Sequence, residues 1–188
     1  MRTFIIRITF AALFAAIISA GAFIVIPVGP VPLVLQNMFT LLSGLILGPV
    51  LGSAAVGLFL AAGIVGVPVF ANNGSPPGLA RIVGPTGGYL FGYLLGAFIA
   101  GLIVGFPRSG KKVSVLRLIL AAAAGTLAVY VPGLFWLKFY TKTDWAQTLV
   151  LGFYPFILGD TVKGGIAVLV TPRLRRTASG MLKEFNNE

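Results

Sequence analysis

Long apolar stretches, separated by short segments that are polar or rich in glycine and proline, run through this 188-residue chain. A helix that crosses the hydrocarbon core of a bilayer needs roughly 20 apolar residues. The pattern predicts an all-α polytopic membrane protein, a single integral membrane domain over residues 1–188 with six transmembrane helices. We place these helices at about residues 4–26, 33–47, 52–67, 85–104, 115–140 and 155–170. The second and third are short for complete spans, so we expect tilt or irregular ends there.

The predicted helices end where proline and glycine gather. Proline cannot continue a helix, so "PVGPVP" (27–32) ends the first one, and "GPVLG" (48–52) separates the second from the third. The stretch "FANNGSPPGLARIVGPTGG" (70–88) is too polar to span a membrane and is predicted to be a loop. After the sixth helix we expect a basic cytoplasmic tail over residues 171–188.

Composition supports the membrane assignment and removes most enzyme classes. The mean hydropathy is +1.00 and only 10% of the residues are charged, whereas soluble domains carry about 25%. Cysteine and histidine are absent, which excludes disulfides, thiolate chemistry and imidazole metal sites. The four acidic residues are too few for paired catalytic carboxylates or a carboxylate metal cage: Asp144, Asp160, Glu184 and Glu188. We therefore expect no catalytic residues, no metal site and no enzymatic activity.

The net charge of +10 comes from short basic segments beside apolar spans. This is the positive-inside pattern of membrane proteins, so we do not expect nucleic-acid binding. Ten basic residues fall at the termini or between the fourth and fifth helices: Arg2, Arg7, Arg108, Lys111, Lys112, Arg117, Arg173, Arg175, Arg176 and Lys183. The opposite side receives three, Arg81, Lys138 and Lys142. The asymmetry predicts a multi-pass protein of the cytoplasmic membrane with both termini in the cytoplasm.

Two opposite charges interrupt the sixth predicted helix. Asp160 and Lys163 stand three residues apart in "PFILGDTVKGG", so they project from nearly the same face of a helix. Each would cost about 2.5–3.5 kcal/mol at the centre of a membrane helix on the insertion scale. Two interpretations follow: an ion pair that serves packing alone, or a ligand site in which Asp160 accepts hydrogen bonds and Lys163 donates them.

The chain also lacks the parts of a self-powered transporter. It contains no Gly-rich turn ending in Gly-Lys-Ser/Thr, no chain of intramembrane acids and no visible inverted repeat. Energy for active transport would then come from another polypeptide. Small residues on the first helix could meet such a partner closely or could pack within the bundle itself: Ala11, Ala12, Ala15, Ala16 and Ala20.

Four segments taken together resemble the BioY family. They are "GAFIVIPVGPVPLVLQNMFTLLSGLILGP" (21–49), "GIVGVPVFANNG" (63–74), "GPTGGYLFGY" (84–93) and "PFILGDTVKGGIAVL" (155–169). This family comprises biotin-specific substrate-binding (S) components of energy-coupling factor (ECF) transporters. The resemblance implies a bacterial membrane protein with the six-helix S-component fold and an outward-facing biotin pocket. It also implies partners: a transmembrane T component, met through the Ala11/Ala15 and Ala12/Ala16 rows, and two ATPase subunits.

The resemblance further suggests roles for residues in the pocket. Asp160 would accept a hydrogen bond from a ureido N–H of biotin, and Lys163 would bind the ureido carbonyl or orient Asp160. Arg81 or another donor would meet the carboxylate of biotin. Polar contacts from the loop and the second helix, and aromatic packing on the bicyclic ring, are expected from Asn72, Asn73, Gln36, Tyr89, Phe70 and Tyr154.

Three other functions stay open at the level of the sequence. The chain could be an S component for another small vitamin, a self-sufficient secondary carrier or channel, or a membrane-embedded enzyme. The last two are disfavoured by the missing second intramembrane carboxylate, histidine and cysteine. No cofactor is expected, and biotin would be the transported ligand.

Overall fold

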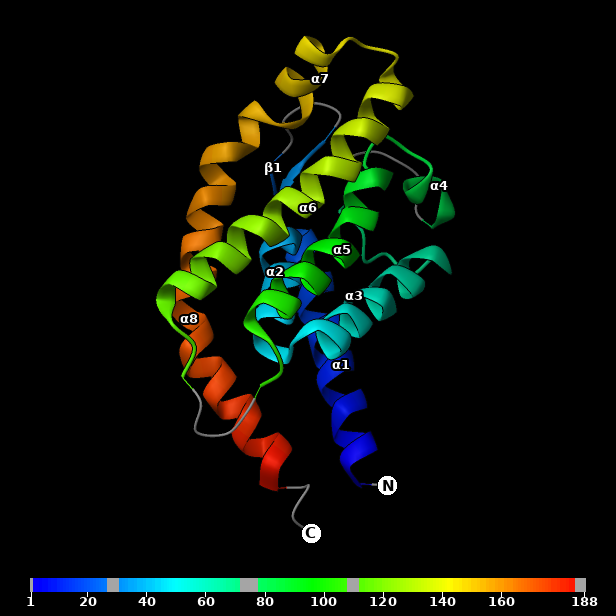
Figure 1. Cartoon of the computed structure of the whole chain (residues 1–188). Helices are drawn as coiled ribbons and strands as arrows, with labels where there is room; N and C mark the ends of the chain where they lie inside the picture. Colours follow the sequence, from blue (N-terminus) through cyan, green and yellow to red (C-terminus); the bar gives the residue numbers. More distant parts are fainter. Residues whose placement is uncertain (1, 27–30, 72–77, 108–111, 185–188) are drawn as a thin grey trace.

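The computed structural model describes residues 2–26, 31–71, 78–107 and 112–184, and most of these residues are helical. Side chains are described for those of them that fall between residues 4 and 181. The elements follow one another as α1 (Arg2–Ala20), η1 (Gly21–Phe23), β1 (Val25–Ile26), β2 (Leu33–Val34), α2 (Gln36–Leu47), α3 (Pro49–Ile64), α4 (Leu79–Ile82), α5 (Gly87–Val104), α6 (Val115–Thr141), α7 (Trp145–Gly152) and α8 (Tyr154–Glu184). The start of α1 and the end of α8 lie at one end of the bundle, and α7 lies at the other (Figure 1).

Local sequence explains the helix boundaries. Gly48 separates α2 from α3 with a φ of 84°, a left-handed conformation that glycine adopts without steric cost, and Pro49 then opens α3. The side chain of Ser114 caps α6 by accepting a hydrogen bond from the backbone N–H of Arg117. Asp144 caps α7 in the same way through the N–H of Gln147, at 2.7 Å.

Helix α5 lies in the middle of the bundle, packed against α2, α3 and α6. Small residues allow this close packing. A Cβ atom on Gly44 of α2 would collide with the backbone carbonyl of Ala97 on α5, and one on Gly96 would come within 2.7 Å of the Gly125 carbonyl on α6. Close backbone approach through small residues is typical of helices that associate inside membranes.

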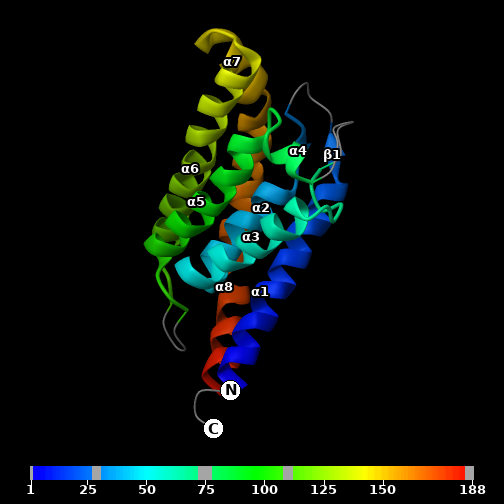
Figure 2. The same cartoon turned by 90° about the vertical axis from the view of Figure 1, so that its right-hand side faces the viewer.

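Two buried apolar clusters lie on either side of α5. One joins α2, α5, α6 and α8 around Leu45, Leu118 and Ala167, and the other joins α1, α3 and α5 around Ile18 and Phe59. Near the α7 end of the bundle, β1 and β2 form a short antiparallel hairpin in which Val25 pairs with Val34 and Ile26 with Leu33. In the view of Figure 2, the hairpin and α4 lie on the same side of the bundle.

Several boundaries differ from those that hydropathy predicts. Helix α1 ends at Ala20 and the chain leaves it through η1 and β1, whereas we expected the first helix to reach residue 26. The predicted end of the sixth helix at residue 170 is wrong, because α8 continues without a break through Pro172 to Glu184. The helices α4 and α7 were not expected at all.

Within the part of the chain that the structure describes, length and composition mark three helical segments as able to cross a membrane: Phe4–Phe23, Gly87–Val104 and Val115–Thr141. Helices α7 and α8 are bent by 43° against each other and would make a fourth span if they count as one. The apolar helices α2 and α3 are shorter, with 12 and 16 residues. The structure thus has the helical bundle of a multi-pass membrane protein.

Candidate ligand-binding site

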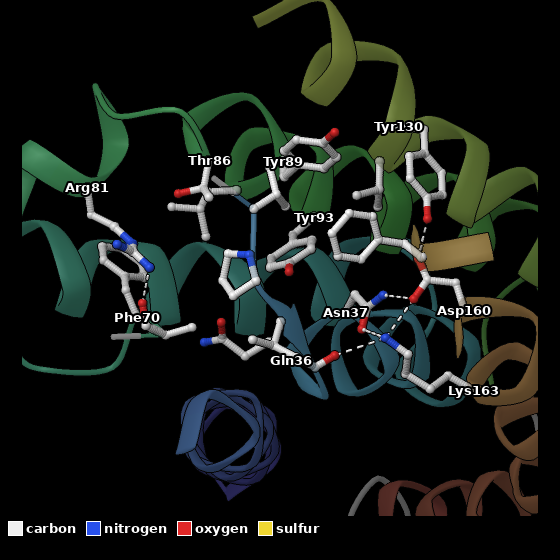
Figure 3. A pocket seen from close by; sticks show the side chains of 17 residues that line it. Gln36, Asn37, Phe70, Arg81, Thr86, Tyr89, Tyr93, Tyr130, Asp160 and Lys163 are labelled. Carbon is white, nitrogen blue, oxygen red and sulfur yellow. Dashed lines mark hydrogen bonds and ion pairs between the residues drawn. The ribbon is translucent and has the colours of Figure 1, made fainter. Parts of the chain in front are cut away.

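A pocket lies between the β hairpin, the start of α2, α5, α6 and α8. Its cavity volume is about 60 Å³, and the empty space that also includes the open mouth is about 590 Å³. Polar side chains gather at its two ends, and aromatic side chains lie between them (Figure 3). The lining residues are Val31, Pro32, Val34, Gln36, Asn37, Phe70, Ala71, Arg81, Thr86, Tyr89, Leu90, Tyr93, Val129, Tyr130, Phe156, Asp160 and Lys163.

One end of the pocket holds a charged cluster built from three helices. The ammonium nitrogen of Lys163 lies 2.6 Å from Asp160 Oδ1, and the two side chains are only 8% and 11% exposed. Asn37, at the start of α2, donates from Nδ2 to the same oxygen at 2.7 Å. Tyr130 of α6 donates its hydroxyl to Asp160 Oδ2 at 2.5 Å. The carboxylate is therefore held by an ammonium, an amide and a phenol (Figure 3).

Counting donors and acceptors separates the roles of the two charged residues. Lys163 has three N–H donors, and they face Asp160 Oδ1, Asn37 Oδ1 at 2.9 Å and the Val34 carbonyl at 2.9 Å. No donor of Lys163 is left for a ligand. A carboxylate accepts about four hydrogen bonds, and the described residues supply three. Asp160 keeps one acceptor position on Oδ2, so it can receive a hydrogen bond from an N–H or O–H in the pocket.

The other end of the pocket is formed around Arg81 of α4. The guanidinium donates from Nη2 to the carbonyl of Ala71, and the residue is 5% exposed. Burial lowers the pKa of this guanidinium from its ordinary value, yet arginine remains protonated in proteins. Nearby, Gln36 donates from Nε2 to the Val69 carbonyl at 2.8 Å and so ties the start of α2 to the segment before Ala71. This end offers a fixed positive charge.

Between the two ends the wall is aromatic and apolar. Tyr89 is anchored by a hydrogen bond from its hydroxyl to the Gly152 carbonyl at 2.8 Å, and its ring meets Tyr130 edge to face at 6.3 Å. Tyr93 and Phe156 are buried beside them. The hydroxyl oxygen of Thr86 is buried and has no hydrogen-bond partner among the described residues, so it is available to a polar ligand atom.

The structure brings most of the predicted site residues together. Six of them line this pocket: Asp160, Lys163, Arg81, Gln36, Tyr89 and Phe70. The expectation for Tyr154 is wrong, because its side chain is 58% exposed at the start of α8 and is not among the lining residues. Asn72 and Asn73 lie outside the described residues.

The two rows of alanines on α1 are placed differently. Ala11 and Ala15 are buried inside the bundle, so they serve the packing of the chain itself and are not open to a partner. Ala12 and Ala16, which form the second row, are exposed. Only the second row remains available for a close helix contact with another chain.

Sequence reasoning missed Asn37, Tyr93, Tyr130, Thr86 and Phe156. Asn37 carried a usable signal, because two adjacent amides, Gln36 and Asn37, open an otherwise apolar helix. Tyr130 carried none: it is one of five aromatic residues in a 27-residue, mostly apolar helix. Its position opposite Asp160 follows from tertiary packing alone.

Comparison with known proteins gives one consistent result. The family model described as "BioY family" matches residues 1–180. A protein of Thermotoga maritima named "Biotin transporter BioY" is 42% identical over 166 residues, which cover 88% of this chain and 94% of the relative. A crystal structure of "the S-component for biotin from an ECF-type ABC transporter" superimposes with a TM-score of 0.77 and 31% identity, covering 90% of both chains. A structure of "FolT bound with folic acid" has a TM-score of 0.56 at 20% identity and shares the fold alone.

Proposed function

Because the chain belongs to the BioY family, we propose that it captures biotin in the pocket between Asp160 and Arg81 as the S component of an ECF transporter. The family and its named relatives support biotin uptake. The observation that carries the proposal for the site is the arrangement of the pocket, which has an acceptor at one end and a cation at the other.

Biotin has matching chemistry at its two ends. Its ureido ring carries two N–H donors and a carbonyl, and its valerate chain ends in a carboxylate. We place the ureido ring at Asp160, whose Oδ2 retains an acceptor position, and the carboxylate toward Arg81. The apolar bicyclic ring and tail would then pack on Tyr89, Tyr93 and the neighbouring apolar wall. Burial of an apolar ligand with a few oriented polar contacts is the common design of such pockets.

Lys163 has a supporting role in this proposal. Its three donors are engaged by Asp160, Asn37 and the Val34 carbonyl, so it orients Asp160 rather than meeting the ureido carbonyl. The unpartnered hydroxyl of Thr86 is a further polar group for the ligand. Of the two roles that the sequence left open for Lys163, the arrangement favours the orientation of Asp160.

We further propose six membrane passes with both termini in the cytoplasm and the pocket facing outward. Helix α2 is about 18 Å long, shorter than the roughly 30 Å hydrocarbon core. Residues 31–35, which precede α2 and include pocket-lining positions, would complete that span, since irregular backbone is tolerated at membrane depth where it lines a cavity. The ten basic residues predicted at the cytoplasmic side support this orientation.

Inward release would depend on partner proteins. The chain lacks a nucleotide-binding motif, so ATP hydrolysis is assigned to two ATPase subunits coupled through a transmembrane T component. The exposed Ala12 and Ala16 are the positions on α1 that would allow close approach of a T-component helix. The structural relative is described as part of an ECF-type transporter, which supports this assignment.

Equilibrium binding to the purified chain tests the ligand. Isothermal titration in detergent should give tight binding of biotin, and none of thiamine, riboflavin or folic acid. Folic acid is included because the fold is shared with a folate-bound protein. Selective binding of another vitamin would replace biotin as the ligand while leaving the fold assignment intact.

A second titration tests the orientation of biotin. Arg81→Gln should weaken the binding of biotin but leave the binding of biotin amide, which lacks the carboxylate charge, nearly unchanged. Wild-type protein should prefer biotin to its amide by tenfold or more, because charge-assisted hydrogen bonds contribute roughly 1.5–3 kcal/mol. Equal loss of affinity for both ligands would place Arg81 outside the carboxylate site.

A further inference from the structure

A second, larger hollow lies on the flank of the bundle between α6 and α8, whose neighbouring positions Figure 1 shows. Its empty space is about 1,280 Å³ including the open side, and its lining is mostly apolar, with Ile119, Leu127 and Leu169 among the walls. Two consecutive glycines of α8, Gly164 and Gly165, form part of the floor. A Cβ atom on either would meet nothing within 4 Å, so missing side chains keep this groove open.

The groove continues toward a basic pocket at the end of the bundle where α1 starts and α8 ends. On α6 the groove is lined as far as Val115, and the basic pocket is lined by Ser114 and by Arg117 in the same first turn. On α8 the groove is lined to Leu169, and the basic pocket is lined by Arg175. The empty space of the basic pocket is about 960 Å³ with its opening included. The groove and the basic pocket therefore share helices α6 and α8, and the chain at the end of α5, from Val104 to Phe106, completes the lining of the basic pocket.

Three cations line the basic pocket: Lys112, Arg117 and Arg175. Arg175 is buried and donates to the Leu45 carbonyl at 2.6 Å and the Gly105 carbonyl at 2.5 Å. Arg117 donates from Nε to the Ile103 carbonyl, close to the same turn. Backbone carbonyls near the C-terminal ends of α2 and α5 thus hold the two guanidinium groups close to each other. Their like charges repel each other there.

Within the described side chains there are only two carboxylates, Asp144 and Asp160, that could balance these cations. Of these two, Asp160 is paired with Lys163 and Asp144 caps α7 at the other end of the bundle. Among the described side chains, no carboxylate lines the basic pocket. An anion from outside the chain would relieve the repulsion, and arginine and lysine are the residues that recognise phosphate.

We propose that the groove and the basic pocket together bind one anionic phospholipid, with an acyl chain between α6 and α8 and the phosphate headgroup at Lys112, Arg117 and Arg175. Such a lipid matches both parts of the site, since it joins an apolar chain to a negative headgroup. A transmembrane helix of another protein would fill the groove but would leave the cations unpaired. Basic pockets between membrane helices are known positions for anionic lipid headgroups.

The test measures how lipids change the melting temperature of the delipidated full chain in detergent. Phosphatidylglycerol should raise it saturably, while phosphatidylcholine with the same acyl chains and inorganic phosphate at equal concentration should not. Lys112→Gln with Arg117→Gln should weaken phosphatidylglycerol binding on the order of tenfold to thirtyfold, because each basic residue near an anionic lipid contributes roughly 1 kcal/mol. The melting temperature of each variant with lipid is compared with that of the same variant without lipid, so a change in basal stability does not affect the measured lipid effect.

Matched controls separate a built site from general attraction. Arg173→Gln with Arg176→Gln removes two exposed charges from the same region of α8, outside the basic pocket, and should leave phosphatidylglycerol binding unchanged. Gly165→Leu should fill the groove and weaken binding, whereas Gly180→Leu, also in open space on α8 but outside the groove, should not. Equal effects of the two charge pairs, equal effects of the two glycine variants, or full stabilisation by inorganic phosphate would overturn the proposal.

Discussion

Replacement of Asp160 by asparagine removes a buried negative charge and leaves the shape of the side chain almost unchanged. The pair with Lys163 is 2.6 Å long and its members are 11% and 8% exposed. Breaking a buried pair by neutralising one member costs roughly 3–5 kcal/mol, because the other charge stays buried without compensation. Asp160→Asn should therefore destabilise the ligand-free protein by about that amount, which corresponds to a melting temperature lower by on the order of 10 °C.

A second substitution in the same pair gives the diagnostic result. Lys163→Met alone should also destabilise, since it leaves the carboxylate with only Asn37 and Tyr130 as donors. The double variant Asp160→Asn with Lys163→Met carries no charge at these two positions and should be more stable than Asp160→Asn alone. Recovery will be partial, because the Val34 carbonyl loses its donor at a cost of about 1–3 kcal/mol.

Thermal unfolding followed by tryptophan fluorescence, without biotin, provides the assay, with all four proteins in one detergent at one concentration. Strong non-additivity is expected, since contacting residues show interaction energies of roughly 0.5–3 kcal/mol in such cycles. If the two single effects simply add in the double variant, the charges do not depend on each other and the reasoning from burial fails.

Three further predictions follow from packing and from the surface. Tyr130→Phe removes one donor to Asp160 and should lower the stability of the ligand-free protein by about 1.5–3 kcal/mol, and a wild-type melting curve would contradict this. Gly44→Ala would place a Cβ against the backbone of α5 and should cost about 1–3 kcal/mol, whereas Gly57→Ala, with nothing within 4 Å, should be neutral or slightly stabilising in the same melts. Ala16→Trp, on the exposed side of α1, should leave biotin binding intact but reduce biotin uptake by cells; loss of both would assign this position to internal packing.

The parts of the fold that depend on local chemistry could be predicted from the sequence. Gly48 followed by Pro49 marks the break between α2 and α3, because the left-handed turn and the first helical position each suit those residues. The continuation of α8 to Glu184 could not be predicted from hydropathy, since the helix becomes polar where it leaves the apolar region while its backbone remains helical. The hydropathy of a segment indicates whether lipid or water surrounds it, but it does not indicate where the helix ends.

The candidate site divides in a similar way. Asp160 and Lys163 could be identified because charged residues inside a membrane segment cost free energy and are therefore rare unless they have a role. Tyr130 and Tyr93 could not, since aromatic residues are common in membrane helices and only packing decides which ones face the pocket. For the same reason Tyr154, adjacent in sequence to the α8 charges, was expected in the site and lies outside it.

Equilibrium binding of biotin to the purified wild-type chain and to the Asp160→Asn, Lys163→Met double variant tests the central claim most directly. The double variant is chosen because it leaves neither member of the pair charged without its partner, and its fold can be verified by the same melting assay. We expect tight binding to the wild type and a loss of 100-fold or more in the folded double variant, because the negative charge of the ureido acceptor and its positioning residue are both gone. Biotin binding retained by the folded double variant, or absent from the folded wild type, would contradict the account.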